Sequence, residues 1–371
     1  MIHITDTDYT LLIPEMNPET IIAHRLINQC LLQNSYTKTE DVVSHMIAIQ
    51  SQEFAPARWA ISIRGHKLSN NSILDAFNSG EILRTHLLRP TWHFVAKADI
   101  RWVVRLTAPH IINRSKYYYK QAGLDATVFT KSNKVITKCL RDKTFLTRKE
   151  IEQELSKNKI RVTGIGLGYI MMKAELDSII CSGPRKGNQF TYALIDELVA
   201  PQKPIERNEA LVRLFNQYII SRGPASLADF SYWSGLSAAD ANKALKMSGI
   251  DLSVCQYQHQ KLYYTPDTVV SDRKASSIIR SGKSNTTILL PDYDEYLMSY
   301  KDKSLLTTEG SSAGKNPTNY NRVIIEKGRI IASWRKAQTE SDVTIQLREG
   351  IKFSKTRLQE AENRYWKFIG T

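Results

Sequence analysis

Hydrophobic residues recur every three to four positions along the first two thirds of the chain, which is the spacing of amphipathic helices. Segments with this pattern are 18–33, 39–49, 56–64, 70–80, 99–121, 125–142 and 208–223. Pro18 suits a first helical turn, and Gly80 suits a helix C-cap. We therefore predict a mainly helical structure for this part of the chain.

The period changes to alternation in 82–96, where β-branched and aromatic residues flank Arg89 and Pro90. Alternation around a turn signal predicts a β-hairpin. Three helices followed by a β-hairpin describe a winged helix, which is a variant of the helix-turn-helix. We expect residues 1–98 to form such a domain.

The same order of elements is predicted twice more. In the second copy, Thr147 and Glu150 have the spacing of a capping box. Residues 167–183 would be its recognition-type helix, and 184–195 its wing, with a turn at Lys186. A third copy is predicted at 208–265, where Ser-capped short helices precede an alternating segment. The copies share a pattern without strong residue identity.

The last part of the chain has a different character. Its predicted strands are 286–300, 322–337 and 343–350, and a helix follows at 354–370. The polar segment 301–321 is rich in Gly, Ser and Asn and predicts a mobile loop. The predicted fold class is therefore α+β, mainly α, with tandem winged-helix (helix-turn-helix) domains followed by a small β-rich C-terminal domain. The expected domains are winged helices at 1–98, 99–200 and 201–285, and an α+β domain at 286–371.

The composition of the 371 residues is that of an ordinary globular protein, with 42% hydrophobic and 24% charged residues. This excludes a largely disordered, collagen-like or coiled-coil chain. The four cysteines form no CxxC pair, which argues against a zinc ribbon, an iron–sulfur cluster and a disulfide scaffold. No apolar run is long enough to span a membrane, and the acidic first ten residues do not resemble a signal peptide. We expect a soluble, cytoplasmic monomer that does not contact a membrane.

Patterns typical of catalysis are few. The glycines of 164–168 (GIGLG) resemble a phosphate-binding loop, but no strand of a βαβ unit precedes them, so we interpret them as a loop before a helix. The eight histidines form no pair at ligand spacing with a third ligand nearby, so neither a metal nor a cofactor is expected. His93 and His110 fit packed or surface roles better than that of a catalytic base.

A formal net charge of +14 favours a polyanionic partner, although good solubility is the alternative. Residues 99–150 hold twelve Lys or Arg against four Asp or Glu, with Trp and Tyr between them. Such a segment suits phosphates and unstacked bases, or it is a solvated helix face. In the predicted hairpin, basic residues flank Leu87 and Leu88, which would wedge between bases or pack against helices. The DNA-binding candidates are Arg84, His86, Arg89, Arg101, Arg105, Arg114, Lys116, Lys120 and Lys186.

Gln50 and Gln52 are separated by Ser51, where a helical pattern ends shortly before Phe54. If the backbone is extended, both glutamine side chains point the same way. Two neutral amides side by side can hold one water by donating and accepting together. By spacing alone the pair is common and carries little weight.

Longer blocks around this pair resemble the winged-helix DNA glycosylases of the AlkZ/YcaQ type, whose hallmark is a catalytic Gln-x-Gln or Gln-x-Asp. The matching blocks are 49–64 (IQSQEFAPARWAISIR), 83–109, 289–304 (LLPDYDEYLMSYKDKS) and 330–337 (IIASWRKA). The resemblance implies winged helices around a DNA channel and hydrolysis of the N-glycosidic bond of alkylated purines. In some members it implies unhooking of interstrand crosslinks.

Carried over to this chain, the resemblance makes Gln50 and Gln52 the catalytic pair. The family's middle residue is usually aliphatic, whereas this chain has Ser51. The two amides would hold a water beneath C1′ of a nucleotide whose purine is already a good leaving group. No lysine occurs at the motif, so we expect a monofunctional DNA glycosylase acting on duplex DNA that is alkylated or crosslinked.

Other interpretations remain open. The acidic trio Asp292, Asp294 and Glu295 supports the site, or it forms ordinary ion pairs at the end of a strand. Trp334 contacts DNA or belongs to the core. The main functional alternative is a non-catalytic winged-helix DNA-binding protein, such as a regulator or a damage sensor. A weaker alternative is a protein-interaction scaffold with incidental basic charge.

Overall fold

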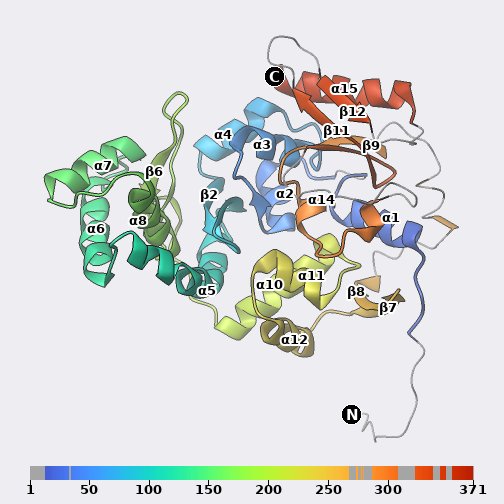
Figure 1. Ribbon diagram of the computed structural model, residues 1–371, viewed down its shortest axis with the longest axis horizontal. Helices are drawn as coiled ribbons and strands as arrows, with labels where there is room; N and C mark the ends of the chain where they lie inside the picture. The colour runs from blue at the N-terminus through green and yellow to red at the C-terminus, as the bar shows by residue number, and fades with distance from the viewer. Residues whose placement is uncertain are drawn as a thin grey trace, which may run out of the picture.

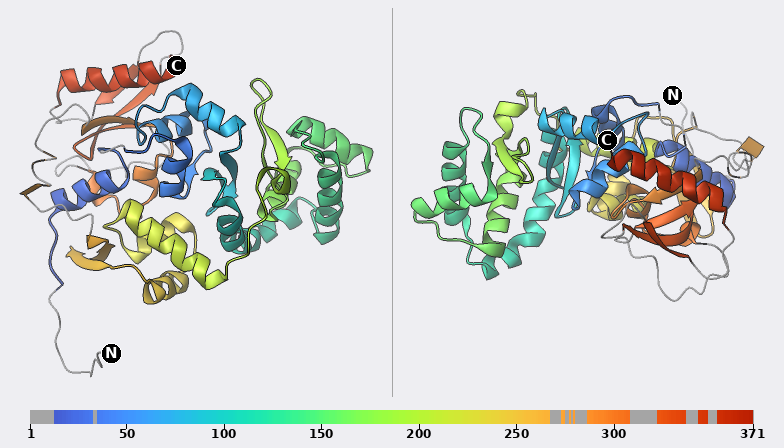
Figure 2. Two further views of the ribbon diagram at one scale, coloured as in Figure 1. Left: turned by 180° about the vertical axis from the view of Figure 1, so that it is seen from behind. Right: turned by 90° about the horizontal axis from the view of Figure 1, so that it is seen from above.

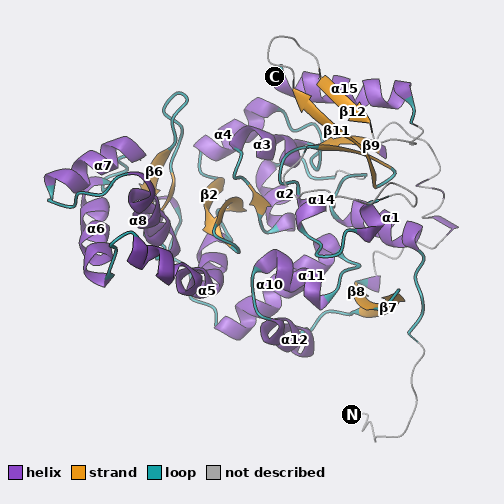
Figure 3. Ribbon diagram, viewed as in Figure 1, coloured by secondary structure: helices purple, strands orange, loops and turns teal. Residues whose placement is uncertain are grey.

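The structure, a computed structural model, describes residues 13–32, 35–266, 273, 274, 277, 279, 286–307, 322–336, 343–347 and 353–370. Its fold is α+β, and the strands form small sheets among the helices (Figure 3). Within these ranges, no helix combines the length and apolar character needed to cross a membrane. Most of the predicted 301–321 loop lies outside the described residues, and Ser304–Leu306 form a short 3-10 helix, η3.

Helices form in the predicted helical segments, but the one predicted at 18–33 ends at Asn28 and the one predicted at 39–49 ends at Met46. The helices are α1 (Pro18–Asn28), α2 (Thr39–Met46), α3 (Phe54–Ser62), α4 (Asn70–Asn78), α5 (Ile100–Gln121), α6 (Ala126–Cys139), α7 (Arg148–Lys157), α8 (Gly164–Leu176), α9 (Ile195–Leu198), α10 (Arg207–Arg222), α11 (Leu227–Ser234), α12 (Ala238–Met247), α14 (Glu295–Met298) and α15 (Lys355–Ile369). The strands are β1 (Ile49–Gln50), β2 (Ile82–Leu87), β3 (Thr91–Ala96), β4 (Leu146–Thr147), β5 (Ile180–Ser182), β6 (Thr191–Leu194), β7 (Ser253–Tyr257), β8 (Gln260–Tyr264), β9 (Thr287–Leu290), β10 (Val323–Glu326), β11 (Arg329–Lys336) and β12 (Val343–Leu347).

The hairpin predicted at 82–96 is confirmed as β2 and β3, which pair antiparallel. β1 joins the other side of β3, so the sheet has the order β1-β3-β2. Leu87 and Leu88 are fully buried in the hydrophobic core. These two residues therefore pack inside the protein and do not form an exposed wedge.

The capping box of α7 is also confirmed. The Thr147 hydroxyl accepts from the Glu150 backbone N–H, and the Glu150 carboxylate accepts from the Thr147 backbone N–H at 2.7 Å. α5 to α8 and the β5–β6 hairpin form a lobe at one end of the molecule (Figure 1). The loop between β5 and β6 projects beyond the helices of this lobe (Figure 2).

Two interpretations of this region were wrong. Residues 164–168 are not a loop, because they form the first turns of α8. Arg148 donates to the Gly164 carbonyl oxygen at 2.8 Å, and burial of Leu167 and Ile170 offsets the low helix propensity of glycine. The recognition-type helix also ends earlier than predicted, at Leu176, and the chain then enters β5.

The C-terminal sheet has the order β12-β11-β10-β9, with α15 packed against it at the other end of the molecule (Figure 1). The strand predicted at 286–300 was too long. The observed strand β9 ends at Leu290, before Pro291, and Glu295–Met298 form the single turn α14. The Asp294 carboxylate caps this turn by accepting from the Tyr296 backbone N–H at 2.8 Å.

Core packing joins the C-terminal sheet to the N-terminal helices. Trp59 of α3 donates its indole N–H to the Leu289 carbonyl oxygen at 2.7 Å. One continuous core contains Trp59, Phe94, Trp334 and Tyr365. The catalytic candidates Gln50 and Gln52 therefore lie where segments from both ends of the chain pack together.

Trp334 belongs to this core. Its side chain is buried, its indole N–H donates to the Leu290 carbonyl oxygen at 2.9 Å, and its ring contacts Tyr365. We predict that Trp334→Ala lowers the free energy of unfolding by about 3–5 kcal/mol because it leaves a large cavity. Urea denaturation measures this change. Unchanged stability with weakened DNA binding would contradict the core assignment.

Candidate functional site

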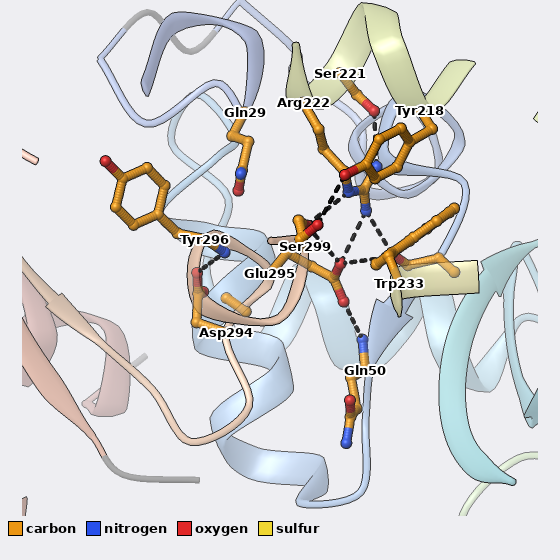
Figure 4. A network of polar contacts seen from close by, with 12 residues as sticks. Gln29, Gln50, Tyr218, Ser221, Arg222, Trp233, Asp294, Glu295, Tyr296 and Ser299 are labelled. Atoms are coloured by element: carbon orange, nitrogen blue, oxygen red, sulfur yellow. Dashed lines mark hydrogen bonds and ion pairs between the residues drawn. The ribbon is translucent and has the colours of Figure 1, made fainter. Parts of the chain in front are cut away.

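Gln50 lies at the end of β1 and is opposite His93 in the adjacent strand. Its backbone N–H donates to the Glu295 Oε1 atom at 3.0 Å. Figure 4 shows this link and shows the Gln50 side chain extending away from Glu295. The residue is 3% exposed, so its position is set by buried contacts.

Glu295 is the centre of a buried polar network (Figure 4). Its Oε2 atom accepts from Arg222 Nη2 of α10 and from Trp233 Nε1 of α11, both at 2.9 Å. Burial alone would raise the pKa of Glu295, but the charge of Arg222 and the hydrogen bonds from Arg222 and Gln50 lower it below its ordinary value. Glu295 is therefore a buried carboxylate that joins β1, α10 and α11.

The Gln50 side chain has a second anchor. Arg89 Nη2 donates to Gln50 Oε1 at 3.0 Å, and Arg89 Nη1 donates to the Tyr232 carbonyl oxygen at 3.3 Å. The guanidinium also lies over the Tyr232 ring. Arg89 therefore orients the Gln50 amide. Gln52 lies in a bend before α3 and is partly exposed.

The peptide between the two glutamines is also held. Arg84 Nε donates to the Ser51 carbonyl oxygen at 3.1 Å. The Arg84 guanidinium stacks over Trp92 and Phe190, and burial lowers the pKa of Arg84 to about 10. Arg84 is thus a buried residue that holds the segment 50–52, which we call the glutamine loop.

The remaining DNA-binding candidates fall into two groups. Three have partners in the protein: His86 contacts the buried Glu175, Arg101 pairs with Asp196 at 2.8 Å, and the exposed Lys186 pairs with Glu150 at 2.9 Å on the surface. The other exposed candidates are Arg105, Arg114, Lys116 and Lys120 of α5. On the same helix, Trp102 and Tyr119 pack inward, whereas Tyr117 and Tyr118 are exposed. The helix therefore combines a packed face with an exposed surface that is both basic and aromatic.

Sequence reasoning did not identify the partners of the acidic trio. Asp294 forms a buried ion pair with Arg64, with two contacts of 2.8 Å, and Asp292 pairs with Arg322 nearer the surface. Arg222 and Trp233 carried no local signal, since they are 73 and 62 residues from Glu295 in the chain. Only a pairing pattern across related sequences could have indicated these contacts.

The arrangement suits binding and orientation by neutral amides. Gln50 and Gln52 present hydrogen-bonding groups without a charge of their own. His93 is fully buried, and its Nδ1–H donates to the Thr91 carbonyl oxygen at 2.9 Å. Burial, with Arg89 nearby, lowers the pKa of His93 to about 3. In the described part of the chain, no three His, Cys, Asp or Glu side chains are arranged to hold a metal ion.

We predict that Glu295→Ala lowers the free energy of unfolding by about 3–5 kcal/mol, because it leaves the buried Arg222 without its carboxylate. The matched control is Asp292→Ala, whose pair with Arg322 is partly exposed and contributes about 1 kcal/mol or less. Urea unfolding of both variants measures the difference. Equal losses would show that Glu295 is not a structural anchor.

We also predict a loss of stability as the pH falls below about 6.5, the ordinary pKa of histidine. The unfolded chain then binds a proton that the buried His93 does not, which costs up to about 1.4 kcal/mol per pH unit. Burial also lowers the pKa of His45 and His110, so the comparison is with His93→Gln. Denaturation between pH 7.5 and 5.5 should give a shallower decline for this variant. Identical slopes would contradict the prediction.

Comparison with known proteins places this site in a family. A family model described as DNA glycosylase AlkZ-like matches residues 43–364. The chain is 22% identical over 348 residues to an interstrand DNA cross-link repair glycosylase of Streptomyces sahachiroi, covering 87% of this chain and 89% of that protein. The structure of Streptomyces sahachiroi DNA glycosylase AlkZ has the same fold, with a TM-score of 0.78 and 18% identity over 96% of this chain and 98% of that one. Since the family match covers most of its length and both glutamines, the chain belongs to the AlkZ-like DNA glycosylase family.

Proposed function

We propose that this protein is a monofunctional DNA glycosylase of DNA repair that hydrolyses the N-glycosidic bond of alkylated purines. Gln50 and Gln52 would hold the attacking water. The observation that carries the proposal is the double anchoring of Gln50, through its backbone by Glu295 and through its side chain by Arg89. Anchoring of this kind fixes the direction of an amide, which positioning of a water requires.

The chemistry needs little acid assistance. A purine alkylated at N7 or N3 is cationic, so its bond to C1′ breaks through an oxocarbenium-like state and the bonding electrons leave with the purine. The water oxygen then forms the new bond to C1′, and its proton leaves to solvent. Neutral amides suit such a step because they orient the water without adding a charge next to a cationic leaving group.

Lys303 is the amine to consider for a lyase reaction, since its Nζ lies 5.4 Å from the Tyr232 ring centre. Burial lowers the pKa of Lys303 to about 8. Its Nζ, however, donates to the carbonyl oxygens of Leu297 and Tyr300. These contacts oppose its use as a nucleophile and support the monofunctional assignment.

Duplex DNA is the proposed partner. The three groups of helices and hairpins within 1–98, 99–200 and 201–285 would act as winged helices around it, in a monomer that ends with the 286–371 domain. The exposed basic and aromatic surface of α5 would contact phosphates. The Streptomyces sahachiroi relative is named for interstrand cross-link repair, so crosslinked DNA is a second substrate to test.

One observation favours the non-catalytic alternative. Gln50 is almost fully buried, and its carbonyl oxygen already accepts from Arg89. If this contact persists on DNA, Gln50 would be a structural residue and the protein a DNA-binding module or damage sensor.

The experiment is chromatography of free bases after incubation with alkylated duplex DNA. We predict that the wild type releases N7-alkylguanine or N3-alkyladenine. Replacing both Gln50 and Gln52 with alanine should reduce release at least a hundredfold, the scale of a lost positioning group, while DNA binding persists. Undiminished release in the double variant would reject the assigned pair, and no release by the wild type would favour the non-catalytic alternative.

A further inference from the structure

A second cluster lies beside the glutamine loop and consists of alternating guanidinium groups and aromatic rings. Its members come from three regions that are distant in the sequence. They are Phe54 and Arg58 of α3, Arg84 of β2, Trp92 of β3, and Arg185 and Phe190 of the loop between β5 and β6. We call this set the arginine–aromatic cluster.

The contacts within the cluster are continuous. Arg84 lies over Trp92 and Phe190, with its guanidinium carbon 4.3 and 4.7 Å from the ring centres. Arg185 lies over Phe190 at 4.4 Å and over Phe54 at 5.0 Å. The Phe54 and Phe190 rings meet edge to face at 5.0 Å. The loop between β5 and β6 therefore packs directly on Phe54, which follows closely after Gln52.

Arg58 also contacts Phe54. Its guanidinium lies 5.0 Å from the Phe54 ring centre, and Nη1 donates to Asn70 Oδ1. Its Nε atom is buried and has no hydrogen-bond partner. Arg58 and Arg185 are both partly exposed, so a ligand in solvent can reach them.

The cluster lacks a matching negative charge. Within the described ranges, none of its three arginines forms an ion pair. Arg84 and Arg185 donate to backbone carbonyl oxygens, those of Ser51 and Gly187. Glu175 and Glu53 act on Arg84 only through space. Desolvation lowers the pKa of all three arginines, and mutual repulsion between Arg58 and Arg185 adds to the effect on Arg58.

We propose that the arginine–aromatic cluster binds a phosphodiester group of the DNA, with Arg58 and Arg185 as the direct contacts. Guanidinium groups bind phosphate oxygens through paired hydrogen bonds, and an anion would relieve the repulsion between them. The exposed ring edges would face the adjoining sugar. The site would fix the strand next to Gln52, so the inference rests on the proposed function and names a phosphate contact for it.

A purely structural role is the competing explanation. The Arg185 backbone N–H donates to Asn78 Oδ1, so the same loop also docks on α4. A structural clamp and a phosphate contact differ in one respect: only the phosphate contact releases counterions when DNA binds. The test therefore measures how affinity depends on salt.

The experiment is fluorescence anisotropy of a labelled duplex at several salt concentrations, with Arg58→Gln and Arg185→Gln. Each variant should bind about tenfold more weakly at low salt, and each should reduce the slope of log affinity against log salt by about 0.9. Lys355→Gln on α15 removes one exposed charge outside the three proposed winged helices and should leave both quantities unchanged. Arg185→Lys should restore the slope but not the full affinity, because it keeps the charge and loses the planar group.

A second experiment uses only the wild-type protein, so its result does not depend on whether the variants fold. Phenylglyoxal modifies accessible arginines, and peptide mass spectrometry reports the rate at each position. DNA should slow the modification of Arg58 and Arg185. The proposal would be overturned if Arg58→Gln and Arg185→Gln both kept the wild-type salt slope, even with weaker binding. Equal modification rates with and without DNA would also overturn it.

These readouts do not require catalysis. If the salt slope falls as expected but the wild type releases no base, the phosphate site stands and the glycosylase proposal fails. If base release occurs and the slope does not change, the glycosylase proposal stands and the phosphate site fails.

Discussion

A single buried carboxylate holds the centre of this structure together. Glu295 accepts hydrogen bonds from Gln50, Arg222 and Trp233, which belong to a short strand and two different helices. Gln50 is 245 residues away from Glu295 in the sequence. A carboxylate buried without such donors would be costly, so these groups must come together if the chain is to fold at all. The position of Gln50 is therefore a consequence of the global fold.

The neighbouring ion pair of Arg64 and Asp294 is also buried and also joins segments that are distant in the sequence. Asp294 caps α14 and binds Arg64, while Arg64 also donates to the Ala60 carbonyl oxygen and to Gln29. Two adjacent acidic residues thus bind two arginines from different helices or helix ends, Arg64 and Arg222. Hydrophobic replacements would offer comparable stability, but they would not fix the directions of the surrounding polar groups. In this protein the buried pairs determine geometry at the glutamine loop.

The features that were predicted correctly from the sequence depend on residues that are close together in the chain. The capping box of Thr147 and Glu150 and the hairpin turn near Arg89 depend on residues within a few positions of one another. The end of α4 is equally local, although its C-cap is Ser79 and the predicted Gly80 follows it with a positive φ. The strand that was predicted through 286–300 stops early because Pro291 and Asp294 favour a turn and a helix start over continued pairing. The glycines of α8 led to the opposite error. They predicted a loop, but burial of neighbouring side chains outweighed their low helix propensity and a helix forms.

The candidate site was predictable only in part, for the same reason. The spacing of Gln50 and Gln52, with the surrounding blocks, pointed to the pair, but the contacts that orient it are long-range. Arg84, Arg89 and His86 looked like a basic hairpin surface, whereas each of them has partners inside the protein. A sequence shows that a residue is charged but not which face of a sheet it occupies or what lies opposite.

The distribution of charge around the site is consistent with the chemistry we propose. The amides of Gln50 and Gln52 are neutral, so they add no charge beside a cationic purine. Arg89 keeps its positive charge next to Gln50, where its hydrogens are donated to the carbonyl oxygens of Gln50 and Tyr232. In the proposed phosphate site, cations act farther along the strand, where each phosphate is negative: Arg58 of α3 and Arg185 of the loop between β5 and β6 both contact Phe54, beyond Gln52. A site of this design separates attraction for the DNA backbone from contact with the damaged base.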